Sequence, residues 1–427
     1  MFIKTNIFEK IIGKKNKVKV PKIIEVSEHK IKRTMIDFNA IKIINRLNKF
    51  GFDAYIVGGA IRDYLLGKKP KDFDVATNAT PKQIKKIFSN SRIIGKRFKL
   101  VHIIFKNAII ETATFRSNHI EQEKGIVLKD NVYGTIEEDA ERRDFGINAL
   151  YYNPDDETII DFVNGYEDIK QRVVKLLKKP SISFLEDPVR MLRAVKYSVL
   201  GDCKIEKDVF KKIIKYSSEL SKVSLLRLYE EINKILKSEC ATKIFLELHR
   251  TKLLKYFIPF LYEELDSGNC DDTIKYLNNA DHHIKENKIE EVELYWGVML
   301  YKKLTSQNFN QNDLTFYVNL KTFFTDILIH LRVPHKVCDH LAKSFYLFYK
   351  LQDEHTIKHF RRMKNHPFLH CGIFLLEVFE VNKVIIDFWK EHLVEKKTEI
   401  RPPRRPFKPQ EKNIPPRKYI TTKNYSD

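Results

Sequence analysis

Residues 54–77 read AYIVGGAIRDYLLGKKPKDFDVAT, and this stretch decides how the chain begins to fold. A short β-prone apolar run stops at Gly58 and Gly59, and apolar residues then recur with helical spacing over residues 61–66, which predicts a strand, a glycine turn and a helix. Glycine lets backbone N–H groups approach an anion closely, so the turn is a candidate cradle for a triphosphate that Arg62 can also reach. A Gly-Gly pair before a helix is often a plain turn, and both interpretations stay open at this point.

Two carboxylates follow in the same unit. Asp72 and Asp74 alternate with Phe73 and Val75, so in a strand of period two both carboxylates lie on one face. Two carboxylates that face one way predict a Mg²⁺ site. An isolated Asp-x-Asp is usually a solvated face, but its order after the glycine turn, among lysines 68, 69 and 71, favours the metal site.

Three further motifs follow in order. Residues 142–150 read RRDFGINAL, residues 161–165 read DFVNG with Asp168 shortly after, and residues 186–194 read EDPVRMLRA. Together with the first stretch, they resemble the motifs of the class II nucleotidyltransferases of the polymerase-β superfamily, which are the bacterial poly(A) polymerases and the tRNA CCA-adding enzymes. Gly146 departs from the Thr that is usual in this family, and Asn164 stands in place of an Asp.

The resemblance implies a fold and a set of roles. The fold class is α+β, with a polymerase-β-like nucleotidyltransferase head built on a mixed sheet, followed by an all-helical neck and body. The implied domains are a basic leader (1–30), the head (31–178), the neck (179–255), the body (256–395) and a basic proline-rich tail (396–427). By the same resemblance, the residues that contact the nucleotide are Gly58, Gly59, Arg62, Arg143, Asp144, Asn148, Asp187, Arg190 and Arg193.

The third motif also has an interpretation from its residues alone. Pro188 suits the first turn of a helix with Asp187 at or near its N-cap, and basic residues then recur every three positions at 190, 193 and 196. Asp187 accepts and Arg190 donates hydrogen bonds, so the two can read the edge of a base. The alternative is a helix cap beside a basic solvated stripe.

Residues 93–103 read IIGKRFKLVHI and resemble the signature of bacterial poly(A) polymerases, where CCA-adding enzymes usually carry a shorter strand. The segment predicts an amphipathic strand entered through a cationic corner, in which Lys96 and Arg97 are candidate RNA contacts; a plain edge strand is the alternative. Glu111, on the next predicted strand, is a candidate third catalytic carboxylate. It can instead pair with Arg116 or face water.

Composition agrees with a polyanionic partner. The 427 residues carry a formal charge of +21, and neutralised phosphates release counterions and strengthen binding. Charge alone does not separate RNA from lipid, but the motifs favour RNA. The five cysteines are scattered and lack Cys-x-x-Cys spacing, so they indicate neither a disulfide framework nor a zinc knuckle. No apolar run approaches the about 20 residues of a spanning helix, so we expect a cytoplasmic protein without membrane association.

Several segments outside the motifs carry expectations of their own. Residues 31–50 have helical spacing, residues 116–138 predict a mobile loop beside the active site, and the chain beyond Pro188 reads as almost entirely helical. The tail predicts a disordered cationic arm that captures RNA or serves only solubility, and its candidate RNA contacts are Arg401, Arg404, Arg405, Arg417 and Lys418.

Two groups of metal-binding residue types resemble ligand sets without convincing spacing. The run 281–283 reads DHH but lacks a second His-Asp partner, and the late histidines, His340 and His370 among them, are expected in core, surface or RNA-contacting roles.

The sequence therefore predicts a template-independent poly(A) polymerase that adds AMP from ATP to RNA 3′ ends, with Asp72 and Asp74 holding two Mg²⁺ ions. The alternatives are a tRNA CCA-adding enzyme and, from another class, a catalytically silent RNA-binding protein. Expected partners are RNA 3′ ends of mRNA, tRNA or decay intermediates, with RNA-decay proteins as further candidates.

Overall fold

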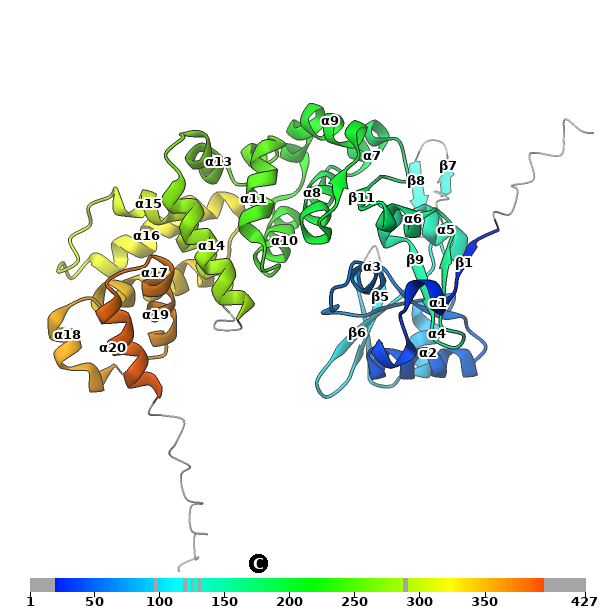
Figure 1. Cartoon of the computed structure of the whole chain (residues 1–427), viewed down its shortest axis with the longest axis horizontal. Helices are drawn as coiled ribbons and strands as arrows, with labels where there is room; N and C mark the ends of the chain where they lie inside the picture. The colour runs from blue at the N-terminus through cyan, green and yellow to red at the C-terminus, as the bar shows by residue number, and fades with distance from the viewer. Residues whose placement is uncertain are drawn as a thin grey trace, which may run out of the picture.

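A computed structural model describes residues 20–95, 99–117, 121–123, 126–129, 132–286, 291–363 and 365–394. The architecture is α+β, as predicted. An eight-stranded sheet and its helices form one end of an elongated molecule, and helices arch from it to the opposite end (Figure 1). Within the described residues, no helix is both long enough and apolar enough to cross a membrane.

The main sheet has the order β1-β10-β9-β2-β3-β6-β5-β4. Its strands are β1 Lys22–Ile24, β2 Ala54–Val57, β3 Asp74–Thr77, β4 Ser91–Ile94, β5 Leu100–Ile104, β6 Ile109–Thr114, β9 Leu150–Asn153 and β10 Thr158–Asp161. Neighbouring strands are antiparallel except β3 and β6, which run parallel and place Val75 opposite Thr112. The strands that carry the predicted motifs, β2, β3 and β6, are therefore adjacent in the middle of the sheet.

The head helices are α1 Val26–His29, α2 Phe38–Lys49, α3 Gly59–Leu65, α4 Pro81–Ile87, α5 Ile136–Glu141 and α6 Gly165–Lys170, with short 3₁₀ turns η1 Arg33–Met35 and η2 Gly146–Asn148. The helix expected over residues 31–50 begins only at Phe38. Asp37 stops it there, because its side chain accepts hydrogen bonds from the backbone N–H groups of Asn39 and Ala40 and so caps the helix.

The loop expected over residues 116–138 is replaced in part by regular structure. β7 Glu121–Glu123 and β8 Ile126–Lys129 form an antiparallel two-stranded ladder, and α5 begins within the same stretch at Ile136. Thr135 and Glu138 form a capping box at the start of α5. The prediction of a plain loop was wrong because alternation over so few residues is a weak signal for a hairpin.

A tight turn connects β10 to α6. The Asp161 carboxylate accepts hydrogen bonds from the backbone N–H groups of Val163, Gly165 and Tyr166. Here the backbone of Gly165 approaches that of Gly146, so that a Cβ at Gly165 would lie 2.0 Å from the Gly146 carbonyl oxygen. A Cβ at Gly146 would lie 2.7 Å from Asp168 Oδ2, which gives a steric reason for glycine at this position of the chain.

Helices fill the rest of the described chain. They are α7 Pro180–Glu186, α8 Val189–Gly201, α9 Lys207–Tyr216, α10 Leu225–Leu236, α11 Ala241–Arg250, α12 Leu254–Phe257, α13 Pro259–Asp266, α14 Asp271–Lys285, α15 Leu294–Thr305, α16 Phe316–Leu328, α17 His335–Lys350, α18 Glu354–Lys358, α19 Leu369–Val378 and α20 Lys383–Val394, with 3₁₀ turns η3 Ser217–Lys222, η4 Ile329–Leu331 and η5 Phe360–Arg362. The prediction of an almost entirely helical chain beyond Pro188 is confirmed. α11 and α12 are separate helices, and Lys252 between them takes a φ of 61°.

A two-stranded ladder joins the head to the neck, and a close glycine contact joins two helices of the body. β11 Val173–Val174 pairs in parallel with β12 Lys204–Ile205, which links the end of the head to the neck across the predicted boundary at residue 178. In the body, a Cβ at Gly297 would lie 2.2 Å from the Phe345 ring, so glycine lets α15 and α17 pack closely around buried aromatic side chains.

Candidate active site

The glycine turn lies where β2 ends and α3 begins. Gly58 has φ 73° and ψ −128°, a backbone conformation that favours glycine. A Cβ at Gly58 would lie 3.6 Å from Arg143 Nη1, and one at Gly59 would lie 3.5 Å from Arg62 Nη2. The turn and both predicted phosphate-binding arginines therefore lie together.

The three predicted carboxylates gather at the adjacent strand ends. Asp74 is the first residue of β3 and pairs with Val57, the last residue of β2, while Asp72 precedes the strand and Glu111 lies on neighbouring β6. All three residues keep solvent-accessible side chains, but protein atoms surround much of the Asp74 carboxyl group. This desolvation and the negative charges of Glu111 and Asp72 raise the pKa of Asp74 to about 6, against an opposing effect of Arg143.

His102 is a neighbour that the sequence did not reveal. The β5–β6 register places His102 opposite Glu111, and its Nε2 lies 3.4 Å from Glu111 Oε1. Glu111 therefore has a histidine as its ion-pair partner in this arrangement. Among the described residues, only one group of three His, Cys, Asp or Glu side chains has all its ligand atoms within 4.8 Å of one another, and that group lies in the body. The ligand atoms of the three head carboxylates are therefore more widely spaced.

A groove of about 760 Å³ borders Asp72. It runs between the start of α2 at Asp37 and the β5–β6 turn, and its walls combine Lys71 and Lys106 with apolar side chains such as Phe73. Asp72, alone of the three candidate carboxylates, thus opens onto a space that can admit a substrate segment.

Arg62 is buried beside the glycine turn. Its guanidinium donates to Asp63 Oδ1 at 2.6 Å and to Asn148 Oδ1 at 2.8 Å, and it lies 4.7 Å from the ring centre of Tyr197. Asn148, another predicted nucleotide contact, is therefore held directly against Arg62. These contacts fix the orientation of the arginine before any ligand binds.

Arg143 is fixed by a buried carboxylate, Asp139, that the sequence analysis missed. Asp139 Oδ2 accepts from Arg143 Nη2 at 3.0 Å and from the Tyr151 hydroxyl at 2.7 Å, and Asp139 Oδ1 accepts from Arg142. Burial raises the pKa of Asp139, but the positive charges of Arg143 and Arg142 lower it by more. The pKa of Asp139 therefore lies below its usual range. A helical Asp followed by arginines at i+3 and i+4 was the available signal.

Asp144 and Arg193 connect the head to the neck. Arg193 Nη1 lies 2.9 Å from Asp144 Oδ2 as an ion pair whose angles do not make a hydrogen bond, while Asp144 Oδ1 accepts from the backbone N–H of Phe145. Tyr197, one turn further along α8, accepts a hydrogen bond from Arg193 and packs edge-on against Phe145. Asp144 and Arg193 were both predicted to contact the nucleotide, and in the structure they lie against each other.

Asp187 and Arg190, the predicted base-selecting pair, each have other partners in the neck. Asp187 Oδ1 accepts from the Val189 N–H at 3.1 Å, as expected of a residue that caps α8, and Asp187 Oδ2 accepts from Arg227 of α10 at 2.7 Å. Arg190 Nη1 donates to Glu186 Oε2 and to Ser183 Oγ, both at 3.0 Å. Arg227 is a further missed residue, because it is 40 positions away in sequence.

The other predicted site residues fall elsewhere. The candidate RNA contacts Lys96, Arg97, Arg401, Arg404, Arg405, Arg417 and Lys418 lie outside the described residues. Asp281 has a structural role, because its carboxylate accepts from the N–H groups of Ala241 and Thr242 at the start of α11.

Family models match two parts of the chain. Residues 54–175 match the poly(A) polymerase head domain, and residues 202–265 match the probable RNA and SrmB-binding site of polymerase A. The first match covers the glycine turn, the carboxylates and the Arg143 region. The second covers most of the predicted neck beyond α8.

Curated relatives carry two names. Poly(A) polymerase I of Salmonella typhimurium is 34% identical over 377 residues, covering 83% of this chain and 81% of that protein. Poly(A) polymerase I of Haemophilus influenzae is 43% identical over 249 residues, covering 56% and 55%. The CCA-adding enzyme of Ligilactobacillus salivarius is 36% identical over 230 residues, covering 53% and 57%.

Solved structures show the same fold. The CCA-adding enzyme of Bacillus stearothermophilus in complex with CTP superposes with a TM-score of 0.61 at 22% identity, covering 83% of this chain and 82% of that one. The sequence motifs, the head geometry and the long match to poly(A) polymerase I agree. The chain belongs to the bacterial poly(A) polymerase family of polymerase-β-type nucleotidyltransferases.

Proposed function

We propose that this polynucleotide adenylyltransferase extends RNA 3′ ends with AMP from ATP without a nucleic-acid template. The observation that supports the proposal is the pairing of Asp74 with Val57, by which Asp74 lies next to the Gly58 turn, with Asp72 just before the same strand and Glu111 on neighbouring β6. The candidate metal ligands and the candidate phosphate-binding groups thus lie near one another on adjacent strands in the middle of the sheet.

The carboxylates fit Mg²⁺. They offer hard oxygen ligands. The pKa of Asp74 is raised to about 6, first by burial of its carboxyl group and then by the like charges of Glu111 and Asp72, which a divalent cation would compensate. Asp72 and Asp74 would hold two ions, with Glu111 as a candidate third ligand. When bound, the ions would lower the pKa of the RNA 3′-hydroxyl and stabilise the charge on the triphosphate and leaving pyrophosphate.

The residues around the turn hold the triphosphate. Gly58 and Gly59 leave room for phosphate oxygens against the backbone, and Arg62 and Arg143 supply positive charge on the same side. Asp139 and Asn148 hold these arginines in place, so little reorganisation is needed when ATP binds.

The neck pair selects the base. Adenine presents an amino donor beside a ring-nitrogen acceptor, which complement the Asp187 carboxylate and the Arg190 guanidinium. Each Asp187 oxygen accepts one of these two hydrogen bonds and has a second lone pair to offer, so the contacts with Val189 and Arg227 orient the carboxylate and leave it able to accept from a base. Asp144 and Arg193, which bridge head and neck, position the two halves of the nucleotide site.

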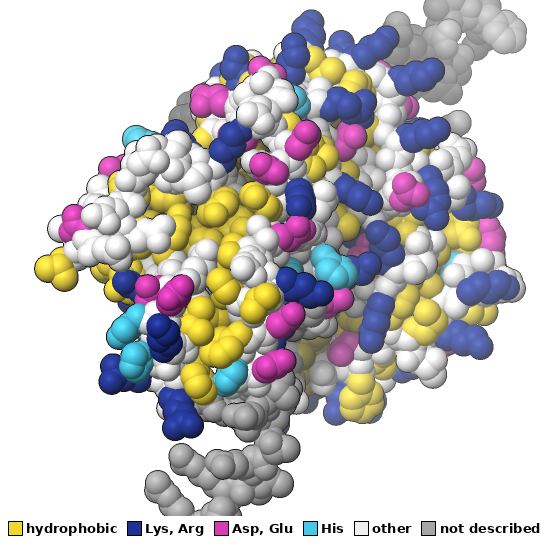
Figure 2. Space-filling model, turned by 60° about the vertical axis from the view of Figure 1, so that its left-hand side comes forward, with side chains coloured by type: hydrophobic (Ala, Val, Ile, Leu, Met, Phe, Trp, Pro, Cys, Tyr) yellow, Lys and Arg dark blue, Asp and Glu magenta, His cyan; other side chains and the backbone are white. Residues whose placement is uncertain are grey.

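We further propose that RNA is the polyanion that the basic surface binds. Lys and Arg side chains are spread across the face in Figure 2 instead of forming one patch, a distribution that suits a long phosphate backbone. Substrates would be mRNA, tRNA or decay intermediates in the cytoplasm, where RNA-decay proteins would be partners.

A CCA-adding activity is the second candidate, because the CCA-adding relative is 36% identical over 230 residues. The test supplies purified protein with a generic RNA 3′ end, and separately with a tRNA that lacks its terminal CCA, under each nucleotide in turn. We expect many AMP residues on the generic RNA and poor use of CTP.

Addition of two C and one A to the tRNA followed by a stop would replace the proposal with CCA addition. No incorporation on either RNA would favour a catalytically silent RNA-binding protein. Asp72→Ala and Asp74→Ala are the controls, since each removes a metal ligand but no RNA contact, so both should lose nucleotide addition and still bind RNA.

A further inference from the structure

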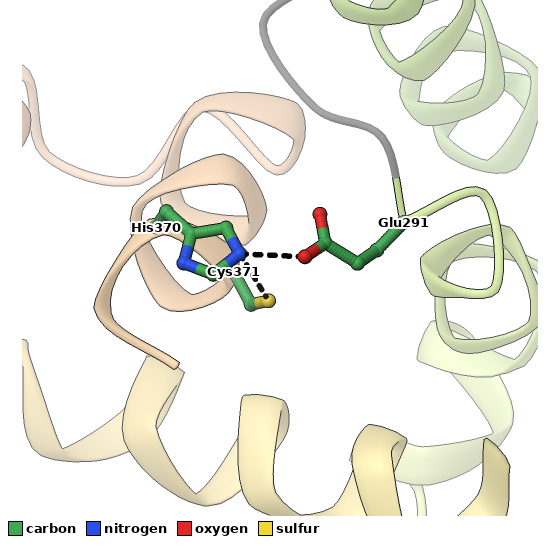
Figure 3. A group of neighbouring side chains, drawn as sticks. All are labelled: Glu291, His370 and Cys371. Carbon is green, nitrogen blue, oxygen red and sulfur yellow. Dashed lines mark hydrogen bonds and ion pairs between the residues drawn. The ribbon is translucent and has the colours of Figure 1, made fainter. Parts of the chain in front are cut away.

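Three side chains converge in the body, far along the chain from the nucleotide site (Figure 3). Glu291 precedes α15, while His370 and Cys371 lie in the first turn of α19. His370 Nε2 lies 2.8 Å from Glu291 Oε1 and 3.4 Å from Cys371 Sγ. All three ligand atoms are within 4.8 Å of one another, and no other described group of three meets that criterion.

A second imidazole borders the same sulfur. His340, on α17, directs its Nε2 to Cys371 Sγ at a distance of 3.4 Å. Cys371 is fully buried, His340 and Glu291 are partly buried, and His370 is exposed. His340 is not part of the described group whose ligand atoms all lie within 4.8 Å of one another, so it borders the sulfur from outside that group. Two separate segments thus direct one sulfur, one imidazole nitrogen and one carboxylate to a common point.

The separations suit a tetrahedral metal. Zinc binds Cys sulfur at about 2.3 Å and His nitrogen or carboxylate oxygen at about 2.0–2.2 Å, so neighbouring ligands around a tetrahedral ion lie about 3.3–3.6 Å apart. The distance of 3.4 Å between His370 Nε2 and Cys371 Sγ falls in this range. The His370–Glu291 distance of 2.8 Å is shorter, as for an ion pair that must open slightly to admit an ion.

The donor chemistry separates this cluster from the head. Thiolate and imidazole prefer borderline-soft ions such as Zn²⁺, whereas the all-carboxylate head cluster prefers Mg²⁺. Three protein ligands leave the fourth tetrahedral position to a water molecule.

We propose that Glu291, His370 and Cys371 bind one Zn²⁺ ion that ties α19 to the segment before α15. The proposal is independent of which nucleotide the head adds. Its alternative is an ordinary His–Glu ion pair packed beside a buried thiol, which would show no stoichiometric metal.

The experiment uses the full chain carrying Asp74→Ala, so that the head carboxylates bind divalent ions less well. Purified protein is stripped with a chelator and titrated with Zn²⁺, and separately with Co²⁺, whose absorption spectrum reports thiolate ligation and tetrahedral geometry. We expect one equivalent of Zn²⁺ per chain, a thiolate-to-cobalt charge-transfer band, and a Tm higher by about 5 °C or more with Zn²⁺.

Cys371→Ser and His370→Gln should each weaken Zn²⁺ affinity at least tenfold, and Cys371→Ser should remove the charge-transfer band. Cys338→Ser is the matched control. Cys338, on α17, is a buried thiol like Cys371, but it hydrogen-bonds to the Phe324 carbonyl instead. If a variant of a proposed ligand residue is unstable, the cobalt spectrum of the protein that carries only Asp74→Ala still tests the proposal. Substoichiometric Zn²⁺, no charge-transfer band, or undiminished affinity in Cys371→Ser would overturn the proposal.

Discussion

The environment of Asp74 disfavours its own ionisation. Burial and the charges of Glu111 and Asp72 raise its pKa from 3.8 to about 6. A carboxyl group whose pKa is raised in the folded state adds stability that is fully present below the unfolded pKa and is lost as pH rises through the folded pKa. Ionised Asp74 therefore lowers the stability of the protein when no divalent cation is bound.

We accordingly expect metal-free Asp74→Asn to unfold at a higher temperature than wild type above pH 6, because the amide cannot ionise. The difference in Tm should shrink as pH falls from about 6 to 3.8, and excess Mg²⁺ at the higher pH should raise the Tm of wild type more than that of the variant. Thermal unfolding by circular dichroism across this range measures both effects. A Tm difference that is the same at every pH would contradict this account.

At the scale of elements, α8 and α10 are joined by a buried ion pair. Lys196 Nζ lies 3.0 Å from Glu231 Oε2, and each side chain is only 8% exposed. Burial raises the pKa of Glu231, but Lys196 and Lys234 outweigh it and lower the value to about 2. Glu231 follows Arg227 by one helical turn, so this pair also holds α10 where Arg227 reaches Asp187.

Glu231→Gln should therefore destabilise the fold by about 3–5 kcal/mol, because it leaves Lys196 buried without a counter-charge. The double variant Lys196→Met with Glu231→Leu should regain most of that loss, while Lys234→Met, which removes the exposed partner, should cost less than about 1 kcal/mol. Urea unfolding at neutral pH measures all three.

The folded pKa of Glu231 is lowered from 4.5 to about 2, so its stabilising contribution is present above pH 4.5 and lost as pH falls towards 2. The gap between wild type and Glu231→Gln should close over that range. A gap that persists unchanged under acid would show that lost packing, and not lost charge, is responsible.

The whole molecule is elongated and strongly basic, and the candidate nucleotide site lies at one end. The head sheet and the last helices occupy opposite ends in Figure 1, and the formal charge is +21 over 427 residues. The sequence beyond Val394 adds further lysines and arginines among prolines. RNA affinity is therefore expected to depend on charges distributed along the chain, and strongly on salt.

Truncation after Val394 should lower RNA affinity and flatten its dependence on salt, because fewer phosphate counterions are released on binding. Turnover at saturating RNA should change little, since the carboxylates and the neck pair are untouched. Filter binding over a salt series measures the slope, and full-length protein with Arg401, Arg404 and Arg405 changed to Gln is the matched control for loss of charge without loss of length. An unaltered slope in the truncated protein would make the tail a solubility segment.

Local patterns in the sequence were sufficient for the elements that depend on neighbouring residues. The strand, glycine turn and helix of residues 54–65 followed from apolar spacing and from the backbone freedom of Gly58. Order along the chain also singled out Asp72 and Asp74; the structure has Asp74 as the first residue of β3 and Asp72 just before the strand, and their role as metal ligands stays a prediction. The family resemblance supplied the remaining roles.

The tertiary structure alone decided which distant side chains meet. The β5–β6 register brings His102 to Glu111, the packing of α5 on β9 brings Tyr151 to Asp139, and the neck brings Arg227 to Asp187. His370 meets Glu291 across 79 residues, although the cysteines had no metal-ligand spacing in sequence. Periodicity reports which face of an element is buried but not which element covers that face, so these pairings are fixed only when the apolar surfaces pack together.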